Sequence, residues 1–145
     1  MVQFGEKYSY MDKILVGIDG SEGSILALEK AMSLVSEGGE IILIAVVPTP
    51  KEKTFVEIEV YNKIRIKADE LIKNTIREFG SKKFNISGLI EEGDAAGKII
   101  DTAVNLNVDL ITLGSRGSSK ISLYPIGSIA NKVVQYSHKP VMVVR

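Results

Sequence analysis

The sequence predicts an α/β fold in which helices cover both faces of an open, five-stranded parallel sheet. Short runs of Ile, Val and Leu alternate with longer stretches of helical period, which is the pattern of successive βαβ units. Several short runs are continuously apolar, as expected of strands buried on both faces. With 145 residues, 45% of them hydrophobic, the chain has the size of one compact domain.

Five apolar runs are the expected strands. They are Ile14–Ile18, Ile41–Val47, Phe84–Ile90, Leu110–Leu113 and Val141–Val144. Residues 1–12 precede the first run and match no element. We therefore expect an N-terminal extension over residues 1–12 and one domain over residues 13–145.

Four helices are expected between these strands. Ser21 is a good N-cap for the first, which we expect to stop at Gly38-Gly39, and Gly80 follows the end of the second. Asp94 and Ser128 are the expected N-caps of the third and fourth. The inward faces are predicted to carry Ile25, Leu28, Met32 and Val35, then Ile64, Ala68, Leu71, Thr75 and Phe79, then Ile99, Ala103 and Leu106, and finally Ala130, Val133 and Val134.

Composition argues against several classes of function. Lys+Arg and Asp+Glu both total 18, so the uniform cationic surface of a nonspecific nucleic-acid binder is missing. The absence of cysteine excludes disulfides, thiolate catalysis and Cys-based zinc sites. No apolar run approaches the roughly 20 residues that span a bilayer, and no signal peptide is apparent. We expect a cytoplasmic protein that binds neither nucleic acid nor membrane.

Charge is unevenly distributed along the chain. From Leu110 to Arg145 there are five basic residues and no Asp or Glu. This segment forms either a positive solvated face or an anion site.

The segment after the fourth strand carries the strongest indication of chemistry. Glycines at 114, 117 and 127 permit close backbone approach to phosphate oxygens, and a helix start at Ser128 points amide N–H groups at the same place. Arg116 and Lys120 add positive charge. A glycine-bearing turn from strand to helix is the structural alternative. The spacing is that of neither a P-loop nor a dinucleotide-binding fingerprint.

The spacing Gly-x2-Gly-x9-Gly-Ser resembles the nucleotide motif of ATP-binding universal stress proteins. Other segments resemble that family as well: Lys13 to Ser21, Gly93-Asp94 with Ile99-Ile100, Asp109 to Gly114 and Lys139 to Arg145. The resemblance covers about residues 13–145. It implies a Rossmann-like fold of the adenine nucleotide α-hydrolase-like kind.

The resemblance also implies a set of ATP ligands in this chain. Gly17, Ile18 and Asp19 would lie beside adenine and ribose, and Val46 would meet the adenine through its backbone. Mg²⁺ or Mn²⁺ would accompany the nucleotide, with Asp19 as the only nearby acid to hold it. The phosphates would be held by Gly114, Ser115, Arg116, Gly117, Ser118, Ser119, Lys120, Gly127, Ser128, Ile129 and Ala130.

Two of these residues have ordinary structural interpretations. Asp19 lies in an Asp-Gly-Ser turn before a helix, where an acid also favours the helix dipole, and the two roles can coexist. Val46 without the resemblance is simply a buried strand residue.

A ligand site shared by Asp19 and the glycine loop constrains the strand order. Ligands of open α/β sheets bind beyond the carboxyl ends of the strands, where the order reverses. Strands one and four should therefore be neighbours, which favours the order 3-2-1-4-5 over 2-1-3-4-5. Strand five is then an edge, and we expect a homodimer through Val141–Val144. In the alternative, Arg145 protects this edge and the chain is a monomer.

We interpret the chain as an ATP-binding regulatory or stress-response module with little or no intrinsic hydrolysis. One alternative is an enzyme, either a slow ATPase or an adenylating relative, although the signature loops of adenylating enzymes are absent. Another is a structural dimer of the same family that binds no nucleotide.

Overall fold

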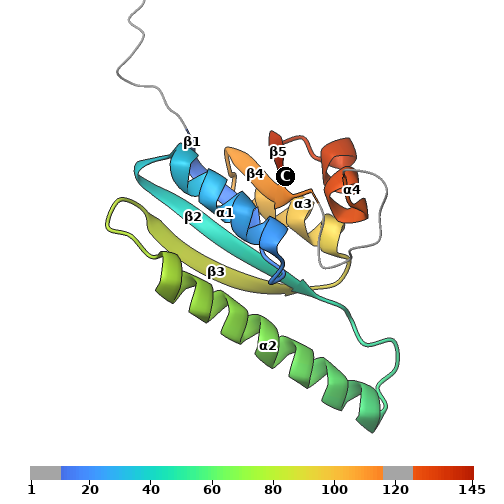
Figure 1. The fold of residues 1–145 in the computed structure, drawn as a ribbon. Coiled ribbons are helices and arrows are strands. Elements are labelled where there is room, and N and C mark those ends of the chain that lie inside the picture. Colours follow the sequence, from blue (N-terminus) through green and yellow to red (C-terminus); the bar gives the residue numbers. More distant parts are fainter. Residues whose placement is uncertain (1–10, 116–125) are drawn as a thin grey trace, which may run out of the picture.

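The computed structural model describes residues 11–115 and 126–145. The predicted extension lies mostly in residues 1–10, outside the described residues, as do positions 116–125 of the glycine loop. The elements are β1 (Met11–Gly17), α1 (Glu22–Leu34), β2 (Val35–Val47), α2 (Phe55–Phe79), β3 (Asn85–Glu92), α3 (Ala95–Asn105), β4 (Leu110–Gly114), α4 (Ser128–Tyr136) and β5 (Val141–Val144), arranged as Figure 1 shows.

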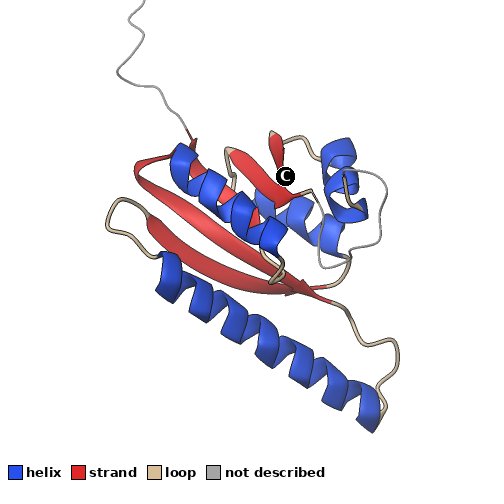
Figure 2. Cartoon of the chain, viewed as in Figure 1, coloured by secondary structure: helices blue, strands red, loops and turns tan. Residues whose placement is uncertain are grey.

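The five strands form one parallel sheet in the order β3-β2-β1-β4-β5, which confirms the predicted topology. In register, Ile14 of β1 lies between Ile41 of β2 and Leu110 of β4. The central strand therefore places its carboxyl end, and the turn that follows it, beside the carboxyl ends of both neighbours (Figure 2).

Side chains of the central strand alternate between two apolar cores. Ile14 and Val16 point to the core under α1 and α2, while Leu15 points to the core under α3 and α4. All three side chains are fully buried. Helices thus cover both faces of the sheet, as the continuously apolar strands predict.

Three helices begin with the polar caps that local sequence dictates. The side chains of Ser21, Thr54 and Asp94 accept hydrogen bonds from backbone N–H groups of the first turns of α1, α2 and α3. The predicted cap of α4 is wrong by one residue. Gly127 occupies the N-cap position, and Ser128 is the first helical residue.

The predicted end of the first helix is also wrong. Val35 leaves the helical conformation and begins β2, where it pairs with Met11. Gly38 and Gly39 lie inside β2 rather than ending α1. A Cβ on Gly39 would lie 2.8 Å from the carbonyl oxygen of Asp12, so the irregular start of the β1–β2 ladder requires a glycine here.

Other boundaries differ by one to three residues. β1 begins at Met11 and ends at Gly17, so Ile18 lies past the strand, although its N–H still bonds to the carbonyl of Ile44 at 2.9 Å. β3 covers Asn85–Glu92, β4 extends to Gly114, and β5 is as predicted. Val134, expected to face inward, is exposed, since the buried side of α4 carries only Ala130 and Val133.

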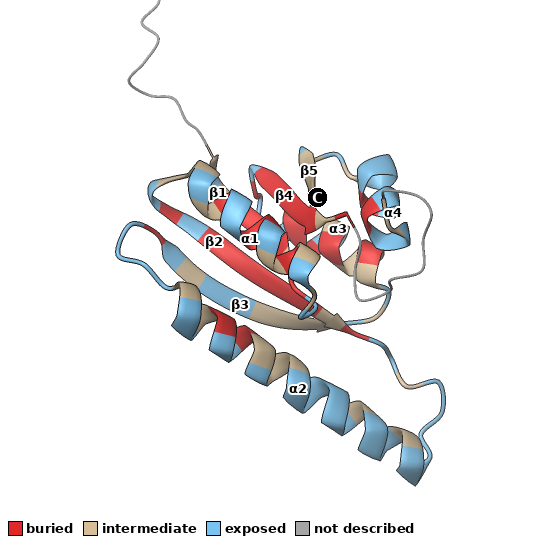
Figure 3. Cartoon of the chain, in the orientation of Figure 1, coloured by how far each residue is buried: buried red, intermediate tan, exposed pale blue. Residues whose placement is uncertain are grey.

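Helix α2 packs on β2 and β3 and extends beyond them (Figure 3). Ile72 rests on Gly88 of β3, where a Cβ would overlap the isoleucine side chain. Buried residues of α2 are confined to this second half of the helix. No helix in the described ranges is long and apolar enough to cross a membrane.

Candidate functional site

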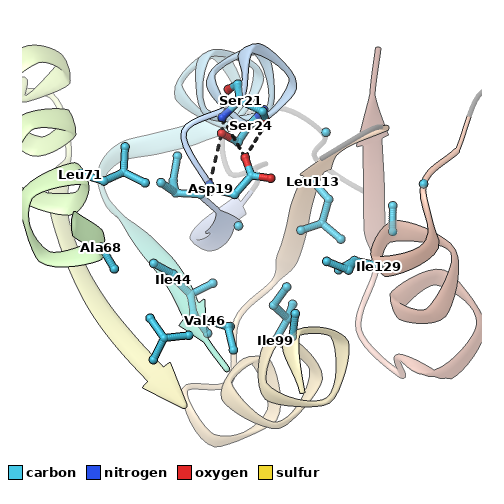
Figure 4. Close-up of a pocket in the computed structure, with 18 of the residues that line it drawn as sticks. Asp19, Ser21, Ser24, Ile44, Val46, Ala68, Leu71, Ile99, Leu113 and Ile129 are labelled. Atoms are coloured by element: carbon cyan, nitrogen blue, oxygen red, sulfur yellow. Dashed lines mark hydrogen bonds between the residues drawn. The ribbon is translucent and has the colours of Figure 1, made fainter. Parts of the chain in front are cut away.

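A cavity of about 590 Å³ opens at the carboxyl ends of β1, β2 and β4. Its walls come from the β1–α1 turn, the last residues of β2 and β4, and the first turns of α3 and α4, and α2 closes one side. In Figure 4 the side chains of Ile44, Leu71, Ile99 and Ile129 surround it from four different elements. The strand order reverses at this edge, the usual place for a ligand in an open α/β sheet.

The structure brings together every predicted site residue that it describes. The five predicted residues from Arg116 to Lys120 lie outside the described residues. The predicted residues that line the cavity are Gly17, Ile18, Asp19, Val46, Gly114, Ser115, Gly127, Ser128, Ile129 and Ala130.

Sequence reasoning missed the wall made by α2 and α3. Ile64, Lys67, Ala68 and Leu71 of α2 line the cavity, and so does Ile99 of α3. Three of the α2 residues belong to the stripe predicted to face inward. A stripe of helical period indicates which side of a helix is covered, but it cannot distinguish a packed sheet from a cavity wall.

Asp19 is held in its turn by Ser21. One carboxylate oxygen, Oδ1, accepts hydrogen bonds from the Ser21 N–H at 2.9 Å and from the Ser21 hydroxyl at 2.5 Å. The Ser21 hydroxyl in turn caps α1 by accepting from the Ser24 N–H at 3.2 Å. Among the described residues Oδ2 has no hydrogen-bond partner, so Asp19 can serve the turn and still present an oxygen to a ligand.

Val46 presents two backbone groups beyond the end of β1. The carbonyl of Ile44 faces β1 and accepts from Ile18, whereas the carbonyl of Val47 faces β3 and accepts from Gly93 at 2.9 Å. Backbone groups of a strand alternate sides, so the N–H and carbonyl of Val46 face the β1 side, where β1 has already ended. A polar group left there without a partner costs free energy unless water or a ligand bonds to it.

The start of α4 differs from the other helix starts at this cavity. α1 and α3 have side-chain caps, but Gly127 supplies none to α4, so among residues 11–115 and 126–145 the first amides of this helix have no side-chain acceptor. The N–H of Gly127 bonds instead to the carbonyl of Ser115, which ties the end of β4 to the start of α4. A helix N-terminus with free amides favours an anion.

The lining is largely apolar, with few charges. Asp19 and Lys67 are its charged side chains among the described residues. The described part of the chain holds no cluster of three or more His, Cys, Asp or Glu side chains that could bind a metal. A cation here would therefore take most of its ligands from a bound molecule and from water.

The model of the Universal stress protein family matches residues 11–145. The chain belongs to the universal stress protein family. This match begins where β1 begins and runs through β5, so every described element lies within it.

Individual universal stress proteins agree with this assignment. Universal stress protein YxiE of Bacillus subtilis is 31% identical over 146 residues, covering 92% of this chain and 99% of its own. The solved structure of MJ0577 from Methanocaldococcus jannaschii is 30% identical with a TM-score of 0.84, covering 92% of this chain and 94% of that one. An Arabidopsis thaliana family protein with AMP bound shares the fold at 16% identity and a TM-score of 0.64, covering 91% and 90%.

Proposed function

We propose that this universal stress protein binds an adenine nucleotide, ATP with Mg²⁺ or Mn²⁺, in the cavity at the carboxyl edge of the sheet. The observation that carries the proposal is the uncapped start of α4 beside the end of β4. The phosphates would bond to the free amides of Ser128, Ile129 and Ala130. Arg116 and Lys120, in the segment between these two ends, would add positive charge, and the backbone amides of the glycine loop would add hydrogen-bond donors.

The base would lie against the backbone of Val46. Its carbonyl can accept from the exocyclic amino group of adenine, and its N–H can donate to a ring nitrogen. Guanine presents an acceptor where adenine presents the amino donor, so it would leave the Val46 carbonyl unpaired. The apolar side chains of Ile44, Ile99 and Leu71 are suited to the faces of a purine ring.

The ribose and the metal would lie near Asp19. With Oδ1 engaged by Ser21, the second oxygen is the one that can reach a ribose hydroxyl or a cation bound to the phosphates. Gly17 and Ile18 would lie beside the nucleoside.

We infer a regulatory role in which a partner protein recognises the occupied or empty state, in a stress response and in the cytoplasm. Asp19 is the one acidic side chain that the described lining contains, and the segment from Gly114 to Arg145 holds no Asp or Glu. Holding a nucleotide is therefore better supported than cleaving it. Within the part of the chain that the structure describes, β5 pairs with β4 alone, and its outer edge is available for the proposed homodimer.

Calorimetric titration with ATP, and separately with GTP, tests the proposal. Ser128→Pro is the sharpest variant because proline is accepted at the first helical position and removes one amide donor without disturbing the helix. Gly127, the residue before it, has ψ of 167°, which proline allows. We expect Ser128→Pro to weaken ATP binding about tenfold, the equivalent of one charge-assisted hydrogen bond, roughly 1.5 kcal/mol.

Ser128→Ala is the matched control, since it removes the hydroxyl but keeps the amide. ATP binding that is unaffected by Ser128→Pro, or equal affinity for ATP and GTP, would contradict the assigned phosphate or base position. Mass spectrometry identifies small molecules that are released from the purified protein. If it finds no nucleotide, and titration with ATP gives no heat, the alternative of a structural dimer that binds no nucleotide is favoured.

A further inference from the structure

The first half of α2 carries an apolar face that the rest of the described chain leaves uncovered. Phe55 is 81% exposed, Ile58 43% and Ile66 58%. With Asn62 they are spaced by three, four and four residues, so they share one side of the helix. This outer face, defined by Phe55, Ile58, Asn62 and Ile66, points away from the core, on which Ala68 and Leu71 pack from the other side of the same helix. Exposed apolar side chains grouped on one side of a helix are typical of an interaction surface.

The charges around the outer face are arranged in a self-complementary way. Glu59 borders its first part, and Lys63 and Arg65 border its second part. None of these three side chains forms an ion pair with another described residue. Farther along α2, by contrast, Lys73 pairs with Asp69 at 2.8 Å, and this hydrogen bond and charge raise the pKa of the lysine.

We propose that the outer face of α2 binds the outer face of a second copy of this chain in an antiparallel helix pair. A twofold axis at Asn62 places the two Asn62 side chains opposite each other. Ile58 then lies opposite Ile66 of the second copy, and Phe55 lies near the same Ile66. Glu59 of one helix then lies near Lys63 of the other, and the twofold axis repeats this pairing of opposite charges.

This contact is separate from the proposed dimer through β5. α2 packs on β2 and β3, at the other side of the sheet from β5, so copies joined at β5 hold their α2 helices far apart. One helix pair of three turns is smaller than a standard interface of about 1,600 Å². The association is therefore weak, and it is to be measured over a series of concentrations up to hundreds of micromolar.

Disulfide trapping tests the geometry directly, because the chain has no cysteine of its own. Asn62→Cys places one thiol at the twofold axis, and we expect it to form a disulfide-linked pair under mild oxidation. Lys73→Cys is the matched control on the same side of α2. Its two copies would lie about 33 Å apart, at 1.5 Å per residue, and remain unlinked. Equal cross-linking of both variants, or none of Asn62→Cys, would overturn the proposal.

Charge variants test the self-complementary arrangement in the full chain. Glu59→Lys makes the rim of the outer face more positive, and the double variant Lys63→Glu with Arg65→Glu makes it more negative. Each variant alone should associate more weakly than the parent in sedimentation at low salt, while an equimolar mixture of the two should associate again. Circular dichroism of each variant checks that α2 remains folded.

The equimolar mixture of the two charge variants distinguishes self-association of this chain from binding of a different partner. Restored association in the mixture supports the helix pair. If Ile58→Glu leaves the sedimentation of the protein unchanged, and the mixture of the two charge variants behaves as its two separate components, the helix-pair proposal is overturned. The outer face would then have to be assigned to a partner of different sequence.

Discussion

Gly114, at the end of β4, packs directly against the backbone of Gly23 in the first turn of α1. A Cβ on Gly114 would lie 2.5 Å from the carbonyl carbon of Gly23 and 2.7 Å from its oxygen. The first glycine of the predicted phosphate loop is therefore required by packing between a strand and a helix, whether or not a nucleotide is bound. Because α1 begins at the cavity, this contact also fixes the position of the turn that carries Asp19.

Replacing Gly114 by alanine should consequently destabilise the protein in the absence of nucleotide. The added methyl group has backbone rather than a movable side chain against it, so α1 must shift. Overpacking of this kind costs about 1–3 kcal/mol. Urea denaturation of nucleotide-free protein measures it. Unchanged stability of Gly114→Ala would show that α1 moves aside without cost.

Gly127→Val should have the opposite effect to Gly114→Ala: it should abolish ATP binding and leave the stability of the fold unchanged. The φ and ψ of Gly127 are −77° and 167°, an extended conformation that valine adopts readily. Its side chain, however, would occupy the approach to the free amides of α4. We expect the affinity for ATP to fall by more than tenfold by calorimetry, with the urea midpoint nearly that of the parent. Binding of ATP at parental affinity would refute a phosphate position at α4.

Most of the fold could be predicted because strands of the parallel sheet are continuously apolar and helices have polar caps. The sheet order followed from one requirement, that Asp19 and the glycine loop share a site. The end of α1 could not be predicted, because the Gly38-Gly39 pair that resembles a helix stop serves a close approach between β2 and Asp12. Nothing in the local sequence distinguishes these two uses of glycine.

Residues of the candidate site could be predicted where they lie in a loop with a recognisable spacing pattern. Those that lie in regular helices could not be predicted. Asp19 and Gly127 belong to such loops, and both line the cavity. Lys67 lines it too, but a lysine on a helix with many charges has no local feature that marks it. Its place depends on how α2 crosses the edge of the sheet, and this is a tertiary property.

Asp19→Ala and Asp19→Asn should differ, because the two roles of this side chain need different atoms. Asparagine keeps an oxygen that can accept from Ser21, whereas alanine removes the acceptor for both hydrogen bonds. We expect alanine to weaken ATP binding by roughly 0.5–1.5 kcal/mol, less than Gly127→Val does. If the carboxylate also holds a metal, asparagine should weaken binding only when Mg²⁺ or Mn²⁺ is present. Calorimetry with and without the metal separates the roles, and identical weakening by both variants would show that the negative charge of the carboxylate matters rather than its hydrogen bonds to Ser21.

Thr112→Val should stabilise the protein. Thr112 lies in the central part of β4 and is fully buried, and its hydroxyl has no hydrogen-bond partner in the described structure. A buried hydroxyl without a partner costs about 1–3 kcal/mol, and valine has nearly the same shape. We expect the melting temperature to rise by a few degrees, about 2–4 °C per kcal/mol for a domain of this size. Ser24, buried but hydrogen-bonded to the Ser21 carbonyl at 2.9 Å, is the control, and Ser24→Ala should not stabilise.

The protein should bind ATP and turn it over slowly or not at all on its own. Hydrolysis needs a positioned water, a group that orients or deprotonates this water, and charge stabilisation for the transferred phosphoryl group. The proposed site provides the charge stabilisation, through the amides of α4 and the basic residues of the loop. Its described lining provides Asp19 as the one acid, with one oxygen already engaged by Ser21.

Phosphate release from freshly purified protein with Mg²⁺ or Mn²⁺ measures this turnover. We expect rates far below the enzyme median of about 10 s⁻¹. Gly127→Val is the control that assigns any activity to the site, because a contaminating ATPase would be unaffected by it. Sustained turnover near the median that disappears in Gly127→Val would replace the binding module with an ATPase. The base would then have to come from Asp19, since no other acidic side chain of the described residues lines the cavity.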